Sequence, residues 1–503
     1  MNTSTTGICH IVGAGPGDEG LITVRGLACV READVILYDY LCNPRLLRFA
    51  RPEARRIFVG KNSEPKITQE MINAMILEET RAGRTVCRLK GGDPYVFGRG
   101  GEEALVLREA GLPFEVVPGI SSSVAVPAYA GIPLTHRHMT SSFAVITGHE
   151  DPTKPDRGVD WKKVAEYPGT KVILMGVGKI DEIARRLVAH GLAPETPVAV
   201  ISWGTYARQR TVTAPLGQIG AKVVEAGLEA PAVTVVGEVV GLRDSLNWFE
   251  TRPLFGKRIV ITRTREQAGT LSARLTALGA EVLELPVIRI TRQTVELPAD
   301  LGKNPLGPYD WILFTSPNAV EHFVAQILEK SGDIRALGTS LLAAIGPATA
   351  RALRQYHLKV AFEPTEHTSE KFAAQFVRDR DLRGARILWP CGNLAGREWI
   401  RTLESQGAEV ETLTVYRTTP ETEDWTGARA DLIRRGADWI VFASRSAAQN
   451  FAALRLPLAG FNMRHASIGP ETTRAMKAAG MGVDVEAAEH TLEGIVQALQ
   501  QQG

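Results

Sequence analysis

Short apolar runs rich in β-branched residues alternate with amphipathic stretches along the whole chain, and this alternation constrains the fold more than any other feature. Representative runs are Cys9–Val12, Val35–Tyr38, Thr85–Leu89, Phe143–Thr147, Val172–Met175 and Val233–Val236. Runs of this length are typical of buried strands, and the amphipathic stretches between them are typical of surface helices. The pattern predicts an α/β protein with largely parallel or mixed sheets.

Chain length and two interruptions of this pattern predict the domain organisation. A chain of 503 residues exceeds what one hydrophobic core usually supports, so two or more domains are expected. The pattern breaks at NWFETRPLFGK before a fresh strand begins at Arg258, and it breaks again near His136–Thr140. The expected parts are a first half, 1–246, with subdomains of about 1–138 and 139–246, then a linker, 247–256, and a second half, 257–503.

The second half contains an internal repeat. The segment FTSPNAVEHF from Phe314 parallels FASRSAAQNF from Phe442, and IGPATARAL from Ile345 parallels IGPETTRAM from Ile468. Each copy has the form of a strand that ends in small polar residues and is followed by a helix. Two matched motifs in the same order predict a duplicated α/β lobe whose strand ends face a shared cleft.

Composition excludes several classes of function. Lys and Arg total 58 against 56 Asp and Glu, so the net charge of +2 offers no broad footprint for nucleic acid or an anionic membrane. The five cysteines form no CxxC pair, which argues against a disulfide framework or a zinc site. No apolar stretch is long enough to span a bilayer, and MNTSTTGICHIVGAG lacks the pattern of a signal peptide. We therefore expect a reduced, cytoplasmic protein without nucleic-acid or membrane partners.

A first glycine-rich segment, HIVGAGPGD, follows the first strand, and Asp39 ends the next one. This is the layout of a dinucleotide-binding fold. The fit fails in detail, because Asp18 occupies the third glycine position counted from Gly13, where its carboxylate would meet a pyrophosphate. Pro16 also removes one backbone N–H donor. NAD binding is therefore not predicted.

A second glycine-rich segment, RLKGGDPYVFGRGGEE, follows the strand that ends at Leu89 and is longer than a surface turn requires. Gly91 and Gly92 permit close approach of a ligand to the backbone, and Asp93 can accept hydrogen bonds from a cationic or hydroxylated ligand. An acidic residue beside glycines suits a ligand with an amino group and a ribose but few phosphates. S-adenosylmethionine fits that description better than NAD does.

The first half carries seven motifs in a fixed order: GAGPGDEGLIT, VILYDYL, VGK, RLKGGDPYVFGRGGEE, VVPGISS, AGIPLTHR and VITGHE. In sequence and in order they resemble those of the uroporphyrinogen-III C-methyltransferases, and the resemblance covers about 245 residues. It implies that S-adenosylmethionine methylates two pyrrole carbons of uroporphyrinogen III, giving precorrin-2 for sirohaem or cobalamin-type corrinoids and leaving S-adenosylhomocysteine. It also implies a homodimer formed through this half.

Residue roles follow from the same resemblance. Asp39 falls on the family's proton acceptor and Lys61 on its proton donor; by themselves, these residues would be interpreted as a helix cap and a surface lysine. The family commonly has Thr-Ala where this chain has Ser121-Ser122, and the serine hydroxyl can replace that of threonine. The implied cofactor contacts are Pro16, Gly91, Gly92, Asp93, Val96, Ser121, Ser122, Met175 and Gly204.

The implied chemistry requires positioning, a base and cationic partners. A pyrrole carbon of the reduced macrocycle is enamine-like and can attack a sulfonium methyl group directly, after which a base removes a proton. The eight carboxylates of the substrate require arginine partners, for which Arg25, Arg45, Arg99 and Arg137 are candidates. His136 and His138 have no cysteine or carboxylate cluster nearby, and methyl transfer needs no Lewis acid, so we expect no metal.

The second half shows no Ser–His–Asp order, paired carboxylates or metal-ligand spacing. Its strand ends carry hydroxyl side chains, which suit either capture of a carboxylate or capping of the helices that follow. This half also carries the segments KRIVITRTREQAGTLSARLTALGAEVLELPVIRI, WILFTSPNAVEHF and LTVYRT and the paired IGP motifs. As a set they resemble uroporphyrinogen-III synthase. The resemblance implies two flavodoxin-like lobes joined by two strands, with lobe one at about 257–290 plus 421–503 and lobe two at about 295–417.

The family's reaction cyclises hydroxymethylbilane with loss of water and inversion of one terminal ring. The main requirement is to hold the linear substrate in the right geometry, and this explains why the sequence contains no recognisable catalytic motif. Tyr416 matches a tyrosine proposed to assist departure of the hydroxyl, and a buried structural tyrosine is the alternative. The candidate substrate-binding residues are Arg263, Thr315, Ser316, Ser444 and Thr472.

The two resemblances together predict a bifunctional enzyme whose second half makes the substrate of its first. Two alternatives remain open at this point. The first half could methylate a later precorrin, or one half could be a non-catalytic tetrapyrrole-binding module. Joining a synthase to the consumer of its product favours the bifunctional enzyme.

Overall fold

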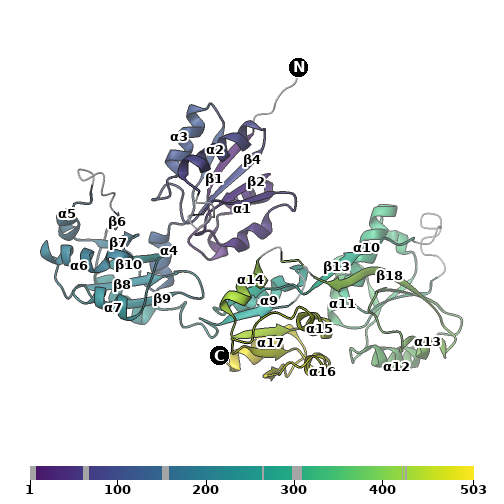
Figure 1. Ribbon diagram of the computed structural model, residues 1–503. Helices are drawn as coiled ribbons and strands as arrows, with labels where there is room; N and C mark the ends of the chain where they lie inside the picture. The colour runs from purple at the N-terminus through teal and green to yellow at the C-terminus, as the bar shows by residue number, and fades with distance from the viewer. Residues whose placement is uncertain are drawn as a thin grey trace, which may run out of the picture. The chain divides into compact units, whose positions relative to one another are not determined.

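The computed structural model describes residues 7–60, 67–149, 158–262, 265–296, 309–421, 423–424 and 427–502, without the side chains of 265–268 (Figure 1). Residue contacts divide the chain into two compact units, which are Met1–Arg258 with Arg274–Val282 and Gln500–Gly503, and Ile259–Ala273 with Leu283–Leu499. The described residues form four sheets, all flanked by helices, so the α/β fold class predicted from the sequence is confirmed. None of the described helices is long and apolar enough to cross a membrane.

The first sheet is parallel throughout and has the order β3-β2-β4-β1-β5. Its strands are β1 (Ile8–Gly13), β2 (Val35–Tyr38), β3 (Arg55–Phe58), β4 (Thr85–Lys90) and β5 (Phe114–Val117). Helix α1 (Val24–Glu32) packs on one face, while α2 (Gln69–Arg81) and α3 (Gly100–Glu109) pack on the other. Because parallel strands place their carboxyl ends at one edge, the loops after β1, β2, β4 and β5 gather there.

The second sheet is mixed and has the order β6-β7-β10-β8-β9. Its strands are β6 (Phe143–Thr147), β7 (Thr170–Leu174), β8 (Pro197–Ser202), β9 (Arg210–Pro215) and β10 (Ala232–Val236). β10 runs antiparallel to both of its neighbours, while β6 and β7 are parallel. The flanking helices are α4 (Ser122–Tyr129), α5 (Trp161–Glu166), α6 (Ile180–Ala189), α7 (Ile219–Glu225) and α8 (Arg243–Leu246).

The segment after α8 packs against the first half of the chain. Trp248 donates its indole N–H to the carbonyl of Ala128 at 3.0 Å, and the buried ring of Phe249 lies 4.8 Å from that of Tyr129. Glu250 accepts hydrogen bonds from Gln209 and Thr211 at 2.8 and 2.7 Å. These three residues lie within the span 247–256 that the sequence suggests as a linker, and they are structural parts of the first half.

The third sheet, β12-β11-β19-β20-β21, combines strands from both ends of the second half of the chain. These are β11 (Arg258–Ile261), β12 (Glu281–Glu284), β19 (Trp439–Phe442), β20 (Arg464–Ser467) and β21 (Val485–Glu486). The accompanying helices are α9 (Arg265–Ala277), α14 (Ala428–Arg435), α15 (Arg445–Ala453), α16 (Pro470–Ala478) and α17 (Leu492–Gln501).

The fourth sheet, β13-β18-β17-β14-β15-β16, is parallel except for β13, which runs antiparallel to β18. Its strands are β13 (Ile288–Arg292), β14 (Trp311–Phe314), β15 (Leu341–Ala344), β16 (Val360–Phe362), β17 (Arg386–Gly392) and β18 (Glu409–Pro420). The accompanying helices are α10 (Pro317–Ser331), α11 (Pro347–Gln355), α12 (Ser369–Asp379) and α13 (Ile400–Glu404). The chain enters this sheet through β13 and leaves it through the long strand β18.

The internal repeat corresponds to equivalent strand–helix junctions in the third and fourth sheets. Ser316 and Ser444 each cap a helix, α10 and α15, by accepting a backbone N–H at 3.2 Å. Gly346 and Gly469 precede α11 and α16, both of which begin with proline, where no intrahelical hydrogen bond is lost. The strand–helix form predicted for each copy is confirmed.

Candidate functional site

The two glycine-rich loops of the first half lie directly against each other. Gly15 and Gly92 exchange backbone hydrogen bonds, with N···O distances of 3.2 and 2.7 Å, and Ala14 N–H donates to the carbonyl of Lys90. A Cβ atom at Gly13 would lie 2.5 Å from Cα of Gly119 in the loop after β5. These loops can therefore approach so closely only because the contact positions are glycines.

Asp93 locks this arrangement with both carboxylate oxygens. Oδ1 accepts the backbone N–H groups of Tyr95 and Val96 at 2.8 and 3.2 Å, and Oδ2 accepts that of Gly119 at 3.0 Å. The carboxylate predicted to meet a ligand thus also fixes the loop that carries it. One lone pair remains for a ligand, on Oδ2, since an ionised carboxylate has about four acceptor sites and three are used.

Ser121 and Ser122 begin α4 beside these loops. Ser121 is the helix cap, and its hydroxyl lies 2.8 Å from that of Ser123. A Cβ atom at Gly92 would lie 3.7 Å from the backbone nitrogen of Ser122. The helix N-terminus therefore opens onto the second glycine loop.

Strand ends of the second sheet complete the surroundings of the first loop. Thr205, after β8, accepts the backbone N–H of Asp18 at 3.0 Å, and Tyr129 donates to the Asp18 carboxylate at 2.7 Å. Gly204 packs against Val126 of α4 so closely that a Cβ atom would clash. Met175, which follows β7, has a left-handed φ of 59° and a side chain that is 52% exposed. Strained backbone of this kind concentrates at functional sites.

Asp18 occupies the helix end that a pyrophosphate would need. Its carboxylate caps the short helix η1 (Glu19–Leu21) by accepting the N–H of Gly20 at 2.8 Å, while its other oxygen accepts the Tyr129 hydroxyl. The position is therefore filled by an internal anion. This geometry fits a cofactor without a pyrophosphate.

Asp39 lies at the carboxyl end of β2, with its side chain 22% exposed. One oxygen accepts the backbone N–H of Leu41 at 3.0 Å and contacts the Cys42 thiol at 3.5 Å. The other lies 3.7 Å from a guanidinium nitrogen of Arg88 on β4. Lys61, predicted as the proton donor, lies outside the described residues.

The candidate arginines for substrate carboxylates differ in their partners. Arg25, Arg45 and Arg99 form ion pairs with glutamates at 2.6, 3.2 and 2.6 Å. Arg137 is exposed and has no carboxylate partner within the described residues. His136 and His138 contact each other edge to face, with ring centroids 5.8 Å apart. In the described part of the chain, no group of three His, Cys, Asp or Glu could hold a metal ion.

A polar group lies at the carboxyl end of β14 in the second half. Ser316 Oγ is 3.2 Å from the hydroxyl of Tyr416, and the Thr315 hydroxyl accepts the indole N–H of Trp389 at 3.2 Å. The Tyr416 ring covers Gly392, where a Cβ atom would lie 2.5 Å from Cζ. Burial raises the pKa of the Tyr416 hydroxyl above its usual value of 10, so the group stays protonated at neutral pH.

The other candidates of this half are not all in that group. Ser444 caps α15 at the end of β19, with its hydroxyl 3.2 Å from that of Ser446. Thr472 is only 3% exposed, on the inner face of α16. Arg263 lies outside the described residues. The structure therefore brings together Thr315, Ser316 and Tyr416.

Two contacts at these sites were missed by sequence reasoning. Trp389 reaches Thr315 because β14 and β17 are neighbours in the sheet, and nothing in the local sequence indicates that order. Arg88 reaches Asp39 from strand β4. The sequence signal for this contact was the strand's ending R-L-K, in which two cations lie two residues apart.

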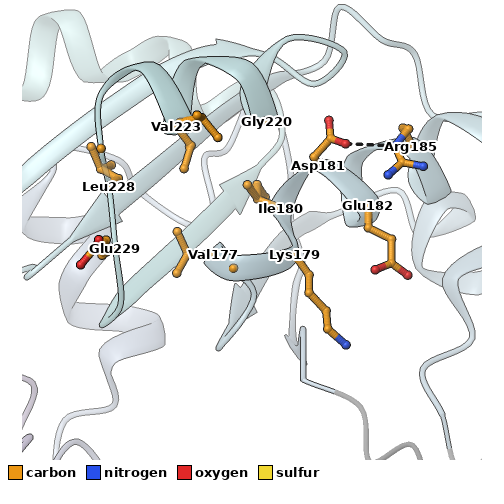
Figure 2. A pocket seen from close by; sticks show the side chains of 13 residues that line it. Val177, Lys179, Ile180, Asp181, Glu182, Arg185, Gly220, Val223, Leu228 and Glu229 are labelled. Carbon is orange, nitrogen blue, oxygen red and sulfur yellow. Dashed lines mark hydrogen bonds and ion pairs between the residues drawn. The ribbon is translucent and has the colours of Figure 1, made fainter.

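A separate hollow of about 510 Å³ lies between α6 and α7 (Figure 2). Its wall includes Ile180, Val223 and Leu228, and at its rim Asp181 pairs with Arg185 at 3.1 Å. It contains none of the residues predicted to act in the first half. The candidate site is instead the edge where the glycine loops meet.

Comparison with protein families gives two matches, one for each half. The family described as Tetrapyrrole (Corrin/Porphyrin) Methylases matches residues 9–220, and the family described as Uroporphyrinogen-III synthase HemD matches residues 269–497. A porphyrin biosynthesis protein HemD from Ruminiclostridium josui is 34% identical over 472 residues, covering 94% of this chain and 93% of the relative.

Further similarities concern the first half alone. An S-adenosyl-L-methionine-dependent uroporphyrinogen III methyltransferase from Methanosarcina barkeri is 50% identical over 241 residues, covering 48% of this chain and 94% of the relative. A crystal structure of uroporphyrin-III C-methyl transferase from Thermus thermophilus, complexed with S-adenyl homocysteine, is 39% identical. It covers 46% of this chain and 93% of that chain, with a TM-score of 0.40.

Proposed function

Because the chain belongs to the porphyrin biosynthesis family of the Ruminiclostridium josui relative, with a methylase segment before a synthase segment, we propose that it catalyses two consecutive reactions. The second half cyclises hydroxymethylbilane to uroporphyrinogen III. The first half then methylates uroporphyrinogen III twice with S-adenosylmethionine and releases precorrin-2. The observation that carries the proposal is the match of both family models to one chain, in regions that do not overlap.

In the methyltransferase half, the paired glycine loops are the proposed cofactor cradle. The partly exposed glycines Gly91 and Gly92 suit a ligand that lies flat against the chain, and the α4 N-terminus offers N–H groups to its carboxylate. The cofactor supplies an activated methyl group. The proposed contacts are Pro16, Gly91, Gly92, Asp93, Val96, Ser121, Ser122, Met175 and Gly204.

The protein's part in methyl transfer is to position the macrocycle and to accept a proton. A carbon–carbon bond forms as the carbon–sulfur bond breaks, and S-adenosylhomocysteine leaves with the electron pair. The ring system then loses a proton, for which Asp39 is the proposed acceptor and Lys61 the proposed donor to the product. Arg137 is the arginine best available for a substrate carboxylate, because Arg25, Arg45 and Arg99 are already paired.

In the synthase half, Tyr416 is the proposed acid. Loss of the substrate hydroxyl as water needs a proton, and a buried phenol with a raised pKa remains able to donate one. Thr315 and Ser316 beside it, and Ser444 in the other sheet, are proposed to bind carboxylates of the bilane. This makes the reaction a lyase step that depends mainly on substrate positioning.

Three further proposals concern the protein's surroundings. Its products feed sirohaem and corrinoid formation, in keeping with the substrate. The methyltransferase half forms a homodimer, as the family resemblance implies. The protein works in the cytoplasm, where its five free, buried cysteines would stay reduced.

The methyltransferase assignment is tested with Asp39→Asn and a matched control, Asp181→Asn, which changes an exposed carboxylate on α6. We expect Asp39→Asn to bind S-adenosylhomocysteine like the parent protein but to lose about 100-fold or more in methylation of uroporphyrinogen III. The control should show parent activity. Undiminished methylation by Asp39→Asn would remove this residue from the mechanism.

A further inference from the structure

A group of buried charges lies beneath the proposed proton acceptor. Parallel strands covered on both faces are usually apolar, yet β4 buries Arg88 and Lys90 with 3% and 4% of their surface exposed. Both side chains point to the face of the sheet covered by α2 and α3, because strand residues two apart share a face. Burying two cations is costly unless they are paired, so their presence calls for a reason.

Glu103 of α3 anchors both cations through a single oxygen. Its Oε1 accepts hydrogen bonds from Lys90 Nζ at 2.9 Å, Arg88 Nε at 3.1 Å and the Gln69 amide at 3.1 Å. Its other oxygen is buried and has no hydrogen-bond partner among the residues that the structure describes. Arg88 is held further by the backbone carbonyls of Leu37 and Leu89, so its guanidinium is fixed on several sides.

One carboxylate cannot balance two cations, and Asp39 supplies the second negative charge. Glu103 binds Nε of the Arg88 guanidinium, and Nη2 of the same group lies 3.7 Å from Asp39 Oδ2. The carboxylate of Asp39 is thus held on one oxygen by Leu41 N–H and faced on the other by Arg88. Of these four charged groups, only Asp39 is partly exposed.

We propose that Arg88, oriented by Glu103, is a positioning residue that keeps the Asp39 carboxylate aimed out of the strand end. The inference rests on the proposed function of Asp39 as the proton acceptor. Arg88 is enclosed and does not touch the substrate. Its role is to fix the direction of the base.

The other titratable groups that face Asp39 do not compete for this role. Tyr40 and Cys42 on the same loop, and Tyr206 after β8, interact with it electrostatically, but burial raises the pKa of all three and leaves them neutral near pH 7. Lys90 also interacts with Asp39, and burial lowers the pKa of its amine. Among the described residues, Arg88 is the cation that lies within 4 Å of the Asp39 carboxylate.

The test compares Arg88→Gln with Arg108→Gln, an exposed arginine on α3, in the full-length protein. Each variant is assayed for kcat and KM in methylation of uroporphyrinogen III and for S-adenosylhomocysteine binding by calorimetry. For Arg88→Gln we expect a fall of about 10-fold or more in kcat at pH 7, with KM unchanged. Cofactor affinity should be unchanged, and Arg108→Gln should match the parent protein.

Three further variants distinguish a failure of the inference about Arg88 from a failure of the proposed function of Asp39. Glu103→Gln should lower kcat while Glu109→Gln, exposed on the same helix, should not. Adding Arg88→Gln to Asp39→Asn should cause no further loss, because the two residues act as a unit. If Asp39→Asn alone retains activity, the proposed function of Asp39 has failed, whatever Arg88 does.

The inference is overturned if folded Arg88→Gln keeps the parent kcat, or if its activity falls only in proportion to lost cofactor binding. Should Arg88→Gln not fold, Arg88→Lys decides. That variant keeps the charge but shortens its reach, so we expect a reduced kcat. A parent kcat in Arg88→Lys would contradict the positioning role.

Discussion

Removing the Tyr416 hydroxyl should separate catalysis from stability in the synthase half. In Tyr416→Phe the ring remains packed over Gly392 and near His322, whose ring centroid is 5.6 Å away. The loss is one hydroxyl and its 3.2 Å contact with Ser316. A neutral hydrogen bond contributes about 1 kcal/mol, so the midpoint of thermal unfolding should fall by about 2–4 °C at most.

The catalytic loss should be much larger. Removing a general acid slows a reaction by about 100- to 10,000-fold, equivalent to about 3–5 kcal/mol in the activation barrier. Because burial keeps the pKa of Tyr416 above 10, the parent activity that depends on this proton should persist through alkaline pH up to that range. The linear bilane closes unaided to the other isomer, so slow enzyme turnover also changes the product.

The assay measures uroporphyrinogen isomers formed from hydroxymethylbilane under anaerobic conditions, after oxidation and chromatographic separation. Tyr309→Phe is the matched control, because Tyr309 bonds Glu411 at the amino ends of the same strands and burial raises its pKa to about 12. The control should lose similar stability and keep parent activity. If Tyr416→Phe forms isomer III at the parent rate, Tyr416 is a structural tyrosine and the reasoning is refuted.

Other substitutions test the fold around the methyltransferase site. Glu103 has a pKa below its usual 4.5, because the nearby cations outweigh the effect of burial. Its stabilising contribution is therefore full above about pH 4.5 and is lost as pH falls through its folded pKa. In Glu103→Gln the free energy of unfolding, followed by circular dichroism, should therefore depend less on pH in that range. Gly119→Ala, whose Cβ would meet the backbone of the glycine loops, should abolish S-adenosylhomocysteine binding, whereas Gly178→Ala, with open space around it, should not. Glu250→Ala leaves the largely buried Arg243 without its carboxylate partner, so the free energy of unfolding measured in urea should fall by about 3 kcal/mol. An unchanged free energy of unfolding would mean that Glu250 belongs to a passive linker.

Local patterns predicted the elements that local physics determines. The apolar runs Val35–Tyr38 and Phe143–Thr147 are strands β2 and β6 with the same bounds, because runs rich in β-branched and aromatic residues favour strands. The repeated FTSP and FASR segments indicated two equivalent helix caps, since serine before a helix satisfies a free N–H group. The sequence also suggested that glycines allow close approach, and the Gly15–Gly92 pairing has this property.

Properties that depend on tertiary neighbours were not predictable in the same way. The Asp93 carboxylate could be assigned to a ligand from its position, but not to the N–H of Gly119, which is 26 residues away. Residues 248–250 looked like a linker because they break the strand–helix pattern, and only the folded partners show them to be packed. Thr472 matches a polar strand-end motif, yet the turn of α16 directs it inward.

The central claim is that one chain both makes uroporphyrinogen III and methylates it. The most direct measurement incubates the full-length protein anaerobically with hydroxymethylbilane and S-adenosylmethionine labelled in its methyl group, followed by mass spectrometry of the tetrapyrroles. The account predicts a product of the type III series that carries two labelled methyl groups, with S-adenosylhomocysteine formed in twofold amount. Unmethylated uroporphyrinogen III would contradict the methyltransferase assignment, and isomer I alone would contradict the synthase assignment.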